Sequence, residues 1–131
     1  MKILIVDDSE KWVQYHSLAI RQLFGADVEI ATANSAKEGV DSLIFNADAP
    51  FDLILTDMQM EPDYLPMMAG EWFIEQIKMF KKYDNSVIVI VSAASDIKHI
   101  AEKYGVQYLP KYNCKYEGSY DFIKNLIKER G

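Results

Sequence analysis

Charged and hydroxyl residues follow four short apolar runs of the chain. KILIV is followed by Asp7 and Asp8, DLILT by Asp57, VIVIV by Ser92 and VQYLP by Lys111. Runs of Val, Ile and Leu without polar alternation are typical of strands buried on both faces of a parallel sheet. The C-terminal ends of such strands share one edge, where open α/β sheets bind their ligands. We therefore expect these side chains to meet in one crevice.

The three carboxylates of this set repel one another unless they take up protons or hold a cation. A small, oxygen-only ligand set favours Mg²⁺, with Mn²⁺ as an alternative, and Mg²⁺ also binds phosphate oxygens. A carboxylate beside it can attack phosphorus in line and become an acyl phosphate, while the Ser92 hydroxyl and the Lys111 ammonium spread charge from the phosphoryl oxygens. Asp57 stands alone after its strand and is the expected nucleophile, whereas Asp7 and Asp8 form a pair suited to the metal.

Each of these residues also has a simpler interpretation. Asp8 could cap the following helix, Asp57 could be an acid of a surface loop, Ser92 could bond to the backbone, and Lys111 could be a solvated charge. Taken singly, the simpler interpretation is favoured in every case. Their joint placement at the ends of separate strands is hard to obtain by chance, and it favours a site that handles a phosphoryl group.

The composition indicates one soluble globular domain over residues 1–131. The formal net charge of −6 disfavours nonspecific binding to nucleic acid or to an anionic membrane. Cys114 is the only cysteine, so an internal disulfide is impossible and a zinc–thiolate site is not expected. No apolar run reaches the length of a secretory signal or a membrane span, and we expect a cytoplasmic protein.

Short apolar runs alternate with segments of helical period along the chain. Strands are expected at Lys2–Val6, Asp27–Ala31, Phe51–Thr56, Ser86–Ser92 and Gly105–Leu109. Helices are expected from Ser9 to Phe24, from Ser35 to Phe45, through Phe73 and Phe80, from Ile97 to a stop at Gly105, and after a cap at Ser119. This alternation predicts right-handed crossovers and a doubly wound α/β sheet.

Over essentially its whole length the chain resembles the receiver domain of two-component response regulators, of the single-domain type. KILIVDDS is similar to the family's first strand and acidic pair, DLILTDMQM to its phosphoacceptor strand, VIVIVSAAS to its hydroxyl strand and GVQYLPK to its last strand with the lysine. The resemblance implies a flavodoxin-like receiver fold, a five-stranded parallel sheet in the order 2-1-3-4-5 with helices on both faces. It also implies that a sensor histidine kinase or a histidine phosphotransfer protein supplies the phosphoryl group. Because the sequence shows no DNA-binding segment, we expect the chain to work through contacts with proteins and not to bind nucleic acid directly.

The same resemblance implies roles for individual residues. Asp57 would be the phosphoacceptor, and Ser92 and Lys111 would contact the phosphoryl group. The metal ligands would be the side chains of Asp7, Asp8 and Asp57 and the backbone carbonyl of Gln59. Ser92 and Tyr108 would form a switch, in which the hydroxyl moves toward the phosphoryl group and the aromatic ring turns inward. Phosphorylation would then shift the protein between an inactive and an active state.

Two features depart from the usual pattern of the family. Tyr112 stands where family members usually have a proline after the lysine, which leaves the local backbone and the reach of Lys111 to be established. The stretch from Asp57 to Gly70 is several residues longer than usual, and it holds four of the six methionines. Flexible thioethers suit adaptable contacts, so this segment either covers the site, meets a partner, or simply packs on the third helix.

Three other functions stay open at this point. An aspartate-nucleophile phosphatase of the haloacid dehalogenase type needs a second acid two residues after the nucleophile, where this chain has Gln59. A flavin-binding flavodoxin-like module needs a Ser/Thr/Gly-rich phosphate loop after the first strand, where this chain has DDSEKW. The third is a receiver-like interaction module that is not phosphorylated.

For the histidine of the first helix, the single cysteine and the C-terminal tyrosines, a structural role is the simplest prediction. His16 lies one turn from Val13 and Ile20 on the inward side of the first helix, and we expect it at the edge of the core rather than as a ligand. Cys114 has no histidine at motif spacing and is expected to be a passive loop thiol. The tyrosines of the C-terminal third either cover the core or form a docking face: Tyr104, Tyr108, Tyr112, Tyr116 and Tyr120.

Overall fold

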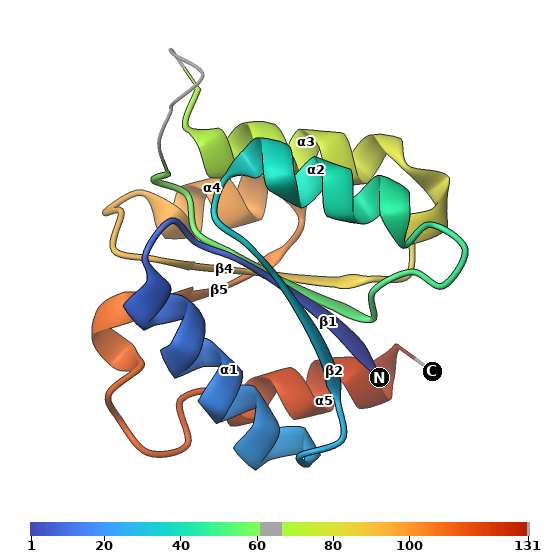
Figure 1. The fold of residues 1–131 in the computed structure, drawn as a ribbon. Coiled ribbons are helices and arrows are strands. Elements are labelled where there is room, and N and C mark those ends of the chain that lie inside the picture. Colours follow the sequence, from blue (N-terminus) through green and yellow to red (C-terminus); the bar gives the residue numbers. More distant parts are fainter. Residues whose placement is uncertain (61–66, 131) are drawn as a thin grey trace.

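Five parallel strands form one sheet in the computed structural model of the protein, which describes residues 1–60 and 67–130 (Figure 1). The strands are β1 (Lys2–Val6), β2 (Glu29–Ala33), β3 (Leu53–Thr56), β4 (Val87–Ser92) and β5 (Gln107–Pro110). Their order in the sheet is β2-β1-β3-β4-β5, and every neighbouring pair is parallel. The C-terminal ends of all the strands therefore lie at one edge, as the sequence predicts.

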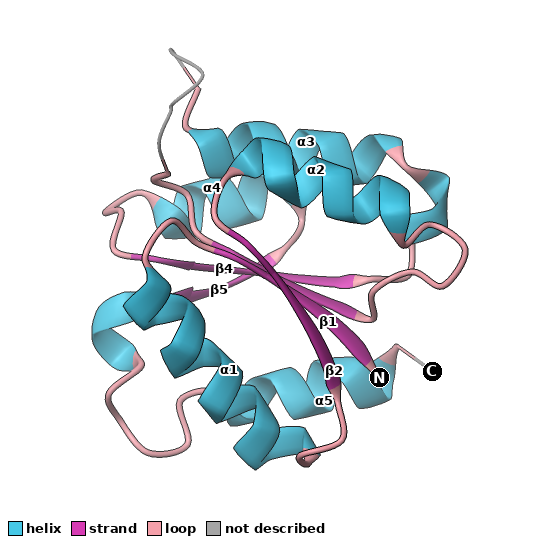
Figure 2. Ribbon diagram, viewed as in Figure 1, coloured by secondary structure: helices cyan, strands magenta, loops and turns pink. Residues whose placement is uncertain are grey.

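Helices cover both faces of the sheet (Figure 2). One face carries α2 (Ala36–Phe45), α3 (Ala69–Met79) and α4 (Ile97–Tyr104), and the other carries α1 (Glu10–Phe24) and α5 (Asp121–Glu129). Short 3-10 helices follow α3 and β5, η1 (Lys81–Tyr83) and η2 (Lys111–Asn113). In the part of the chain that the structure describes, no helix combines the length and the apolar character that a membrane span requires.

The apolar strand residues divide between two cores, one on each face of the sheet. Within β1, Leu4 and Val6 pack into the core under α2, α3 and α4, while Ile3 and Ile5 pack into the core under α1 and α5. These four side chains are at most 1% exposed. Because both faces of the strand are buried, it needs no polar alternation, which explains why unbroken apolar runs locate the central strands.

Four strands begin one or two residues later than the sequence predicts. β3 begins at Leu53 rather than Phe51, and β4 begins at Val87 rather than Ser86. β2 begins at Glu29 rather than Asp27, because pairing with β1 sets its register. It is an edge strand with mostly half-buried or exposed side chains, so its hydrophobic pattern is a weak guide to its ends. β5 begins at Gln107 rather than Gly105, because Gly105 is the left-handed C-cap of α4 with φ of 66°.

Local sequence predicts the starts of two helices correctly and one wrongly. Ser9 and Ser35 cap α1 and α2, each accepting a hydrogen bond from the backbone N–H three residues later. The prediction that Ser119 caps the last helix is wrong, because α5 begins at Asp121 without a side-chain cap. The Ser119 hydroxyl instead donates to the carbonyl of Cys114 at 3.3 Å within the turns that precede α5.

Gly70, in the first turn of α3, lies directly against the segment that follows β3. A Cβ at Gly70 would lie 1.9 Å from the carbonyl oxygen of Asp57 and 2.5 Å from the Cα of Met58, both backbone atoms. The Gly70 N–H also donates to the carbonyl of Met58 at 2.9 Å. This close approach ties the start of α3 to the end of β3.

We expect Gly70→Ala to lower the free energy of unfolding by about 3 kcal/mol, because the backbone must move to relieve the overlap. Gly105→Ala is the matched control. Its left-handed φ costs about 1 kcal/mol, but a Cβ there would meet no described atom within 4 Å. Urea denaturation of both variants measures the difference, and equal losses would contradict the close approach.

Candidate functional site

The backbone brings the ends of β1 and β3 together. The N–H of Asp57 donates to the carbonyl of Val6 at 3.0 Å, and the N–H of Asp7 donates to the carbonyl of Ala33 at 3.1 Å. One carboxylate oxygen from each of Asp7, Asp8 and Asp57 lies within 4.8 Å of the others. The predicted meeting of these three acids at the edge of the sheet is confirmed.

Asp57 is 5% exposed, and its two carboxylate oxygens have different surroundings. Oδ1 accepts hydrogen bonds from the backbone N–H groups of Met58 at 2.7 Å and Gln59 at 3.3 Å. Oδ2 accepts a hydrogen bond from the Lys111 ammonium at 2.7 Å. The main chain therefore fixes the orientation of this carboxylate and directs one oxygen toward the lysine.

Lys111 joins the end of β5 to the acids. Its ammonium lies 2.7 Å from Asp57 Oδ2, 2.9 Å from Asp7 Oδ2 and 5.0 Å from the centre of the Trp12 ring. Burial disfavours the charged ammonium, but hydrogen bonds and attraction to the two aspartates outweigh it and raise the pKa of Lys111. Tyr112, which is 71% exposed in η2, does not prevent the lysine from reaching the acids.

Asp7 is 1% exposed, and burial raises the pKa of its carboxyl group against the lowering effects of Ser9 and Lys111. Its Oδ1 accepts a hydrogen bond from the backbone N–H of Ser9 at 2.9 Å. Its Oδ2 forms an ion pair with Lys111 that lacks hydrogen-bond geometry, which leaves this buried oxygen without a hydrogen-bond partner among the described residues. Such an oxygen, beside two further carboxylates, fits a hard divalent cation.

His16 is 1% exposed, which confirms its predicted place in the core. Burial lowers the pKa of His16 to about 4, and the charge of Lys111 adds to this effect. The ring stacks on Trp12 with centroids 5.3 Å apart. His16 is therefore a neutral imidazole at neutral pH.

This lowered pKa makes the stability of the fold depend on pH. Between the folded pKa of about 4 and the ordinary value of 6.5, the unfolded chain binds the proton that the folded chain excludes. The contribution of His16 is fully present above pH 6.5 and is lost as the pH falls toward 4. From pH 7 to pH 4.5 we expect the wild type to lose about 2–3 kcal/mol more unfolding free energy than His16→Gln. Urea denaturation at both pH values checks this, and the same loss in both proteins would contradict it.

Three further predicted site residues lie in or after the strands: Ser92 ends β4, Tyr108 lies within β5, and Gln59 follows β3. Ser92 is fully buried, and its hydroxyl oxygen accepts a hydrogen bond from the N–H of Ala94 at 3.2 Å. Tyr108 is half-buried, pairs in register with Ile90 and packs against the core under α4. Gln59 contributes its N–H to Asp57, and its carbonyl as a metal ligand stays a prediction. The switch roles of Ser92 and Tyr108 also stay predictions.

The described methionines after Asp57 pack against the core and do not extend into solvent. Met58 and Met60 are 0% and 2% exposed and belong to the core under α2, α3 and α4, and Met68 packs against the same core. Packing against the third helix is therefore the interpretation that the described residues support. The part of the covering-loop hypothesis that concerns residues 61–66 lies outside the described residues.

The tyrosines of the C-terminal third serve the core more than a docking face. Tyr120 is 6% exposed, and Tyr104 and Tyr108 are half-buried against the other core. Tyr112 and Tyr116 are the exposed members, at 71% and 59%. The prediction that these residues cover the core thus holds for three of the five.

Sequence reasoning missed Trp12. The Trp12 ring faces the Lys111 ammonium and stacks on His16, so it lies beside the site. The signal that could have found it is its spacing: Trp12, Tyr15 and His16 stand three and four residues apart on one helix, which places them on one side of it.

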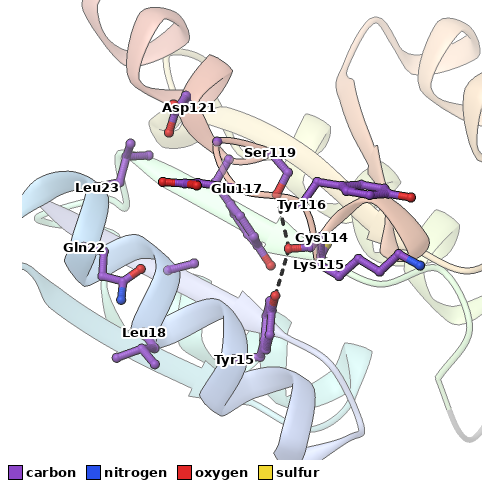
Figure 3. Close-up of a pocket in the computed structure, with 13 residues that line it drawn as sticks. Tyr15, Leu18, Gln22, Leu23, Cys114, Lys115, Tyr116, Glu117, Ser119 and Asp121 are labelled. Carbon is purple, nitrogen blue, oxygen red and sulfur yellow. Dashed lines mark hydrogen bonds between the residues drawn. The ribbon is translucent and has the colours of Figure 1, made fainter.

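A groove of about 500 Å³ lies between α1 and residues 114–121 (Figure 3). Tyr15 donates to the carbonyl of Cys114 at 2.8 Å across one end of the groove, where Ser119 also bonds the same carbonyl. Among the described residues, the three clustered aspartates are not part of its walls.

Cys114 is 3% exposed and burial raises the pKa of its thiol, which agrees with the predicted passive role.

Comparisons with known proteins agree with this geometry. Residues 3–113 match the model of the response regulator receiver domain family. The chemotaxis response regulator CheY4 of Vibrio cholerae is 25% identical, with a TM-score of 0.71 and coverage of 95% of this chain and 97% of that chain. The receiver domain of the Francisella response regulator 1452 is 22% identical, with a TM-score of 0.68 and coverage of 98% and 97%.

A mutant receiver domain of the histidine kinase CKI1 from Arabidopsis thaliana is 23% identical, with a TM-score of 0.68 and coverage of 98% of this chain and 87% of that chain. At this level of identity the likeness shows a shared fold. Among curated proteins, a sequence search finds no significant match.

Proposed function

The chain belongs to the response regulator receiver domain family, and on that premise we propose that it accepts a phosphoryl group on Asp57 and relays a signal to a partner protein. The surroundings of Asp57 carry this proposal. The Lys111 ammonium lies 2.7 Å from its Oδ2, and carboxylate oxygens of Asp7 and Asp8 lie within 4.8 Å. Phosphoryl transfer to a carboxylate needs both a cation for the phosphoryl oxygens and acids that bind a metal.

The proposed reaction makes one bond and breaks one. A carboxylate oxygen of Asp57 bonds to the phosphorus of a phosphohistidine on the donor, while the phosphorus–nitrogen bond breaks and its electron pair stays with the imidazole. The product is an acyl phosphate on Asp57. Lys111 balances the negative charge on the phosphoryl oxygens. The Ser92 hydroxyl oxygen accepts a hydrogen bond from the Ala94 N–H, so the hydroxyl proton can be donated to a phosphoryl oxygen.

The donor set fits Mg²⁺, with Mn²⁺ as the alternative. The proposed ligands are the carboxylates of Asp7, Asp8 and Asp57 and the carbonyl of Gln59. The Asp7 Oδ2 atom, which accepts no hydrogen bond from the described residues, supports this assignment. A bound ion would neutralise charge on the carboxylates and on the phosphoryl oxygens. Without such neutralisation, three acids at this spacing repel an incoming phosphoryl group.

In the proposed function, phosphorylation transmits the signal by changing the protein surface that a partner binds. We assign the switch to Ser92 and Tyr108, which end β4 and lie in the neighbouring β5. Movement of the Ser92 hydroxyl toward the phosphoryl group would leave space behind it for the Tyr108 ring, which is half-buried before phosphorylation. Phosphorylation then shifts a population of two states, and a partner reads the surface of the last helices and strand.

The proposed setting is a signalling relay in the cytoplasm. Residues 1–131 would form one receiver domain that takes its phosphoryl group from a sensor histidine kinase or a histidine phosphotransfer protein. The net charge of −6 supports contacts with proteins rather than with nucleic acid. The acyl phosphate would be lost by hydrolysis, so the chain would not turn over a substrate as a conventional enzyme does.

Intact mass spectrometry after incubation with acetyl phosphate and Mg²⁺ tests this function. We expect a gain of a single phosphoryl group, and no gain when a chelator removes the metal. Repeated hydrolysis of a small phosphoester without a covalent product would favour the phosphatase. A purified protein that is yellow would favour the flavin module, and the absence of any covalent product or ligand would favour an interaction module.

A further inference from the structure

Two buried polar atoms that lack a hydrogen-bond partner in the described part of the chain lie near each other beside the acidic cluster, although one of them, Asp7 Oδ2, forms an ion pair with Lys111. Among the described residues, only Asp7 Oδ2 and His16 Nε2 are buried side-chain polar atoms without a hydrogen-bond partner. They lie 4.0 Å apart, and each residue is 1% exposed. A buried polar atom without a partner is destabilising, so two such atoms at one place point to a function.

The two ring nitrogens of His16 have different neighbours. The Tyr120 hydroxyl can donate or accept and so fits either tautomer, whereas the carboxylate oxygen of Asp7 near Nε2 can only accept. His16 Nδ1 lies 2.6 Å from the Tyr120 hydroxyl oxygen. A neutral imidazole has one N–H, and a proton on Nδ1 would direct the Nε2 lone pair at the lone pairs of Asp7 Oδ2. The favourable assignment is therefore a Tyr120 hydroxyl that donates to Nδ1 and an Nε2–H that faces Asp7.

Aromatic packing holds this ring in place. The His16 ring stacks on Trp12 at 5.3 Å and meets Tyr120 at 5.8 Å and Tyr15 at 6.4 Å, both edge to face. Rotation about χ2 would exchange Nε2 for carbon and break the Tyr120 hydrogen bond. The ring thus presents one N–H in a fixed direction, which is how imidazoles and carboxylates commonly orient the ligands of a metal.

We propose that His16 is a positioning residue that orients the Asp7 carboxylate toward the metal, and that the hydrogen bond to Tyr120 holds the imidazole ring in place for this role. This role rests on the proposed metal site. The backbone of Ser9 already holds Asp7 Oδ1, and Lys111 lies beside Oδ2 at 2.9 Å. If Lys111 turned toward a phosphoryl group, the Nε2–H of His16 would remain beside Oδ2 at 4.0 Å, ready to donate after a small shift of the carboxylate.

The Mg²⁺ affinity of the protein, measured by titration calorimetry without a phosphoryl donor, tests this role of His16. His16→Gln keeps an N–H donor near the position of Nε2, whereas His16→Leu removes it. We expect His16→Leu to bind Mg²⁺ about 10–100-fold more weakly than the wild type, and His16→Gln to recover most of the loss. Tyr120→Phe should weaken binding as well. Tyr15→Phe is its matched control, because the Tyr15 hydroxyl bonds the carbonyl of Cys114 and not His16.

The nitrogen chemical shifts of the His16 imidazole provide a second measurement. It uses the metal-free wild type and therefore does not depend on whether any variant folds. The Nε2–H tautomer is expected for His16, and the Nδ1–H tautomer would overturn the role. Equal Mg²⁺ affinity in the wild type and His16→Leu would overturn it too, while leaving the proposed function intact. A wild type that binds no Mg²⁺ would overturn the proposed function together with this role.

Discussion

Asp57→Asn is expected to abolish covalent phosphorylation. The amide has the size of the carboxylate but lacks its negative charge and its nucleophilic oxygen pair, so no acyl phosphate can form. The ion pair of Lys111 with Asp7 at 2.9 Å is retained in the variant, so we expect the fold to persist. Intact mass after incubation with acetyl phosphate and Mg²⁺ measures the effect, and circular dichroism checks the fold.

Asp41→Asn is the matched control for this variant, because Asp41 is an exposed acid on α2. We expect it to gain the phosphoryl group as the wild type does. A phosphoryl gain in folded Asp57→Asn equal to that of the control would show that another residue is the acceptor.

Lys111→Met is expected to lower the free energy of unfolding by about 3–5 kcal/mol, because it leaves buried carboxylates without their cation. Asp7 and Asp57 are 1% and 5% exposed, and the Lys111 side chain is 11% exposed, so solvent screens these charges little. We further expect Mg²⁺ to restore much of the lost stability, since the ion replaces the missing positive charge.

Lys98→Met controls for the loss of a lysine, because Lys98 is exposed on α4. It should change the unfolding free energy by less than about 0.5 kcal/mol and show no added response to Mg²⁺. Urea denaturation of the wild type and both variants, with and without Mg²⁺, measures these values. A Lys111→Met protein as stable as the wild type in the absence of metal would contradict the described ion-pair geometry.

The parts of the fold that the sequence predicts best are those with the simplest physical cause. Buried central strands need unbroken apolar runs, and the polar residue after each run must reach the sheet edge. That is why the amino-acid pattern alone indicates that Asp7, Asp57 and Lys111 meet. The ends of the edge strand β2 are predicted less well, because its half-exposed side chains leave them without a clear pattern.

The features that the sequence could not predict are contacts between separate elements of the fold. The contact between His16 on α1 and Tyr120 before α5 joins residues 104 positions apart, and no local pattern indicates it. The close approach of Gly70 to the backbone of Asp57 likewise depends on how α3 docks. The length and the methionines of the segment after Asp57 leave surface contact and packing equally open for Met60, and the chain turns this side chain into the core at 2% exposure.

Reductive trapping tests the central claim most directly. Borohydride reduces an aspartyl phosphate to homoserine, so peptide mass spectrometry of the treated protein reads the acceptor from its position in the chain. In protein incubated with acetyl phosphate and Mg²⁺, we predict homoserine at position 57 and at no other aspartate. Homoserine at Asp7 or Asp8, or a phosphoryl group that survives borohydride on another residue while position 57 stays aspartate, would contradict Asp57 as the phosphoacceptor.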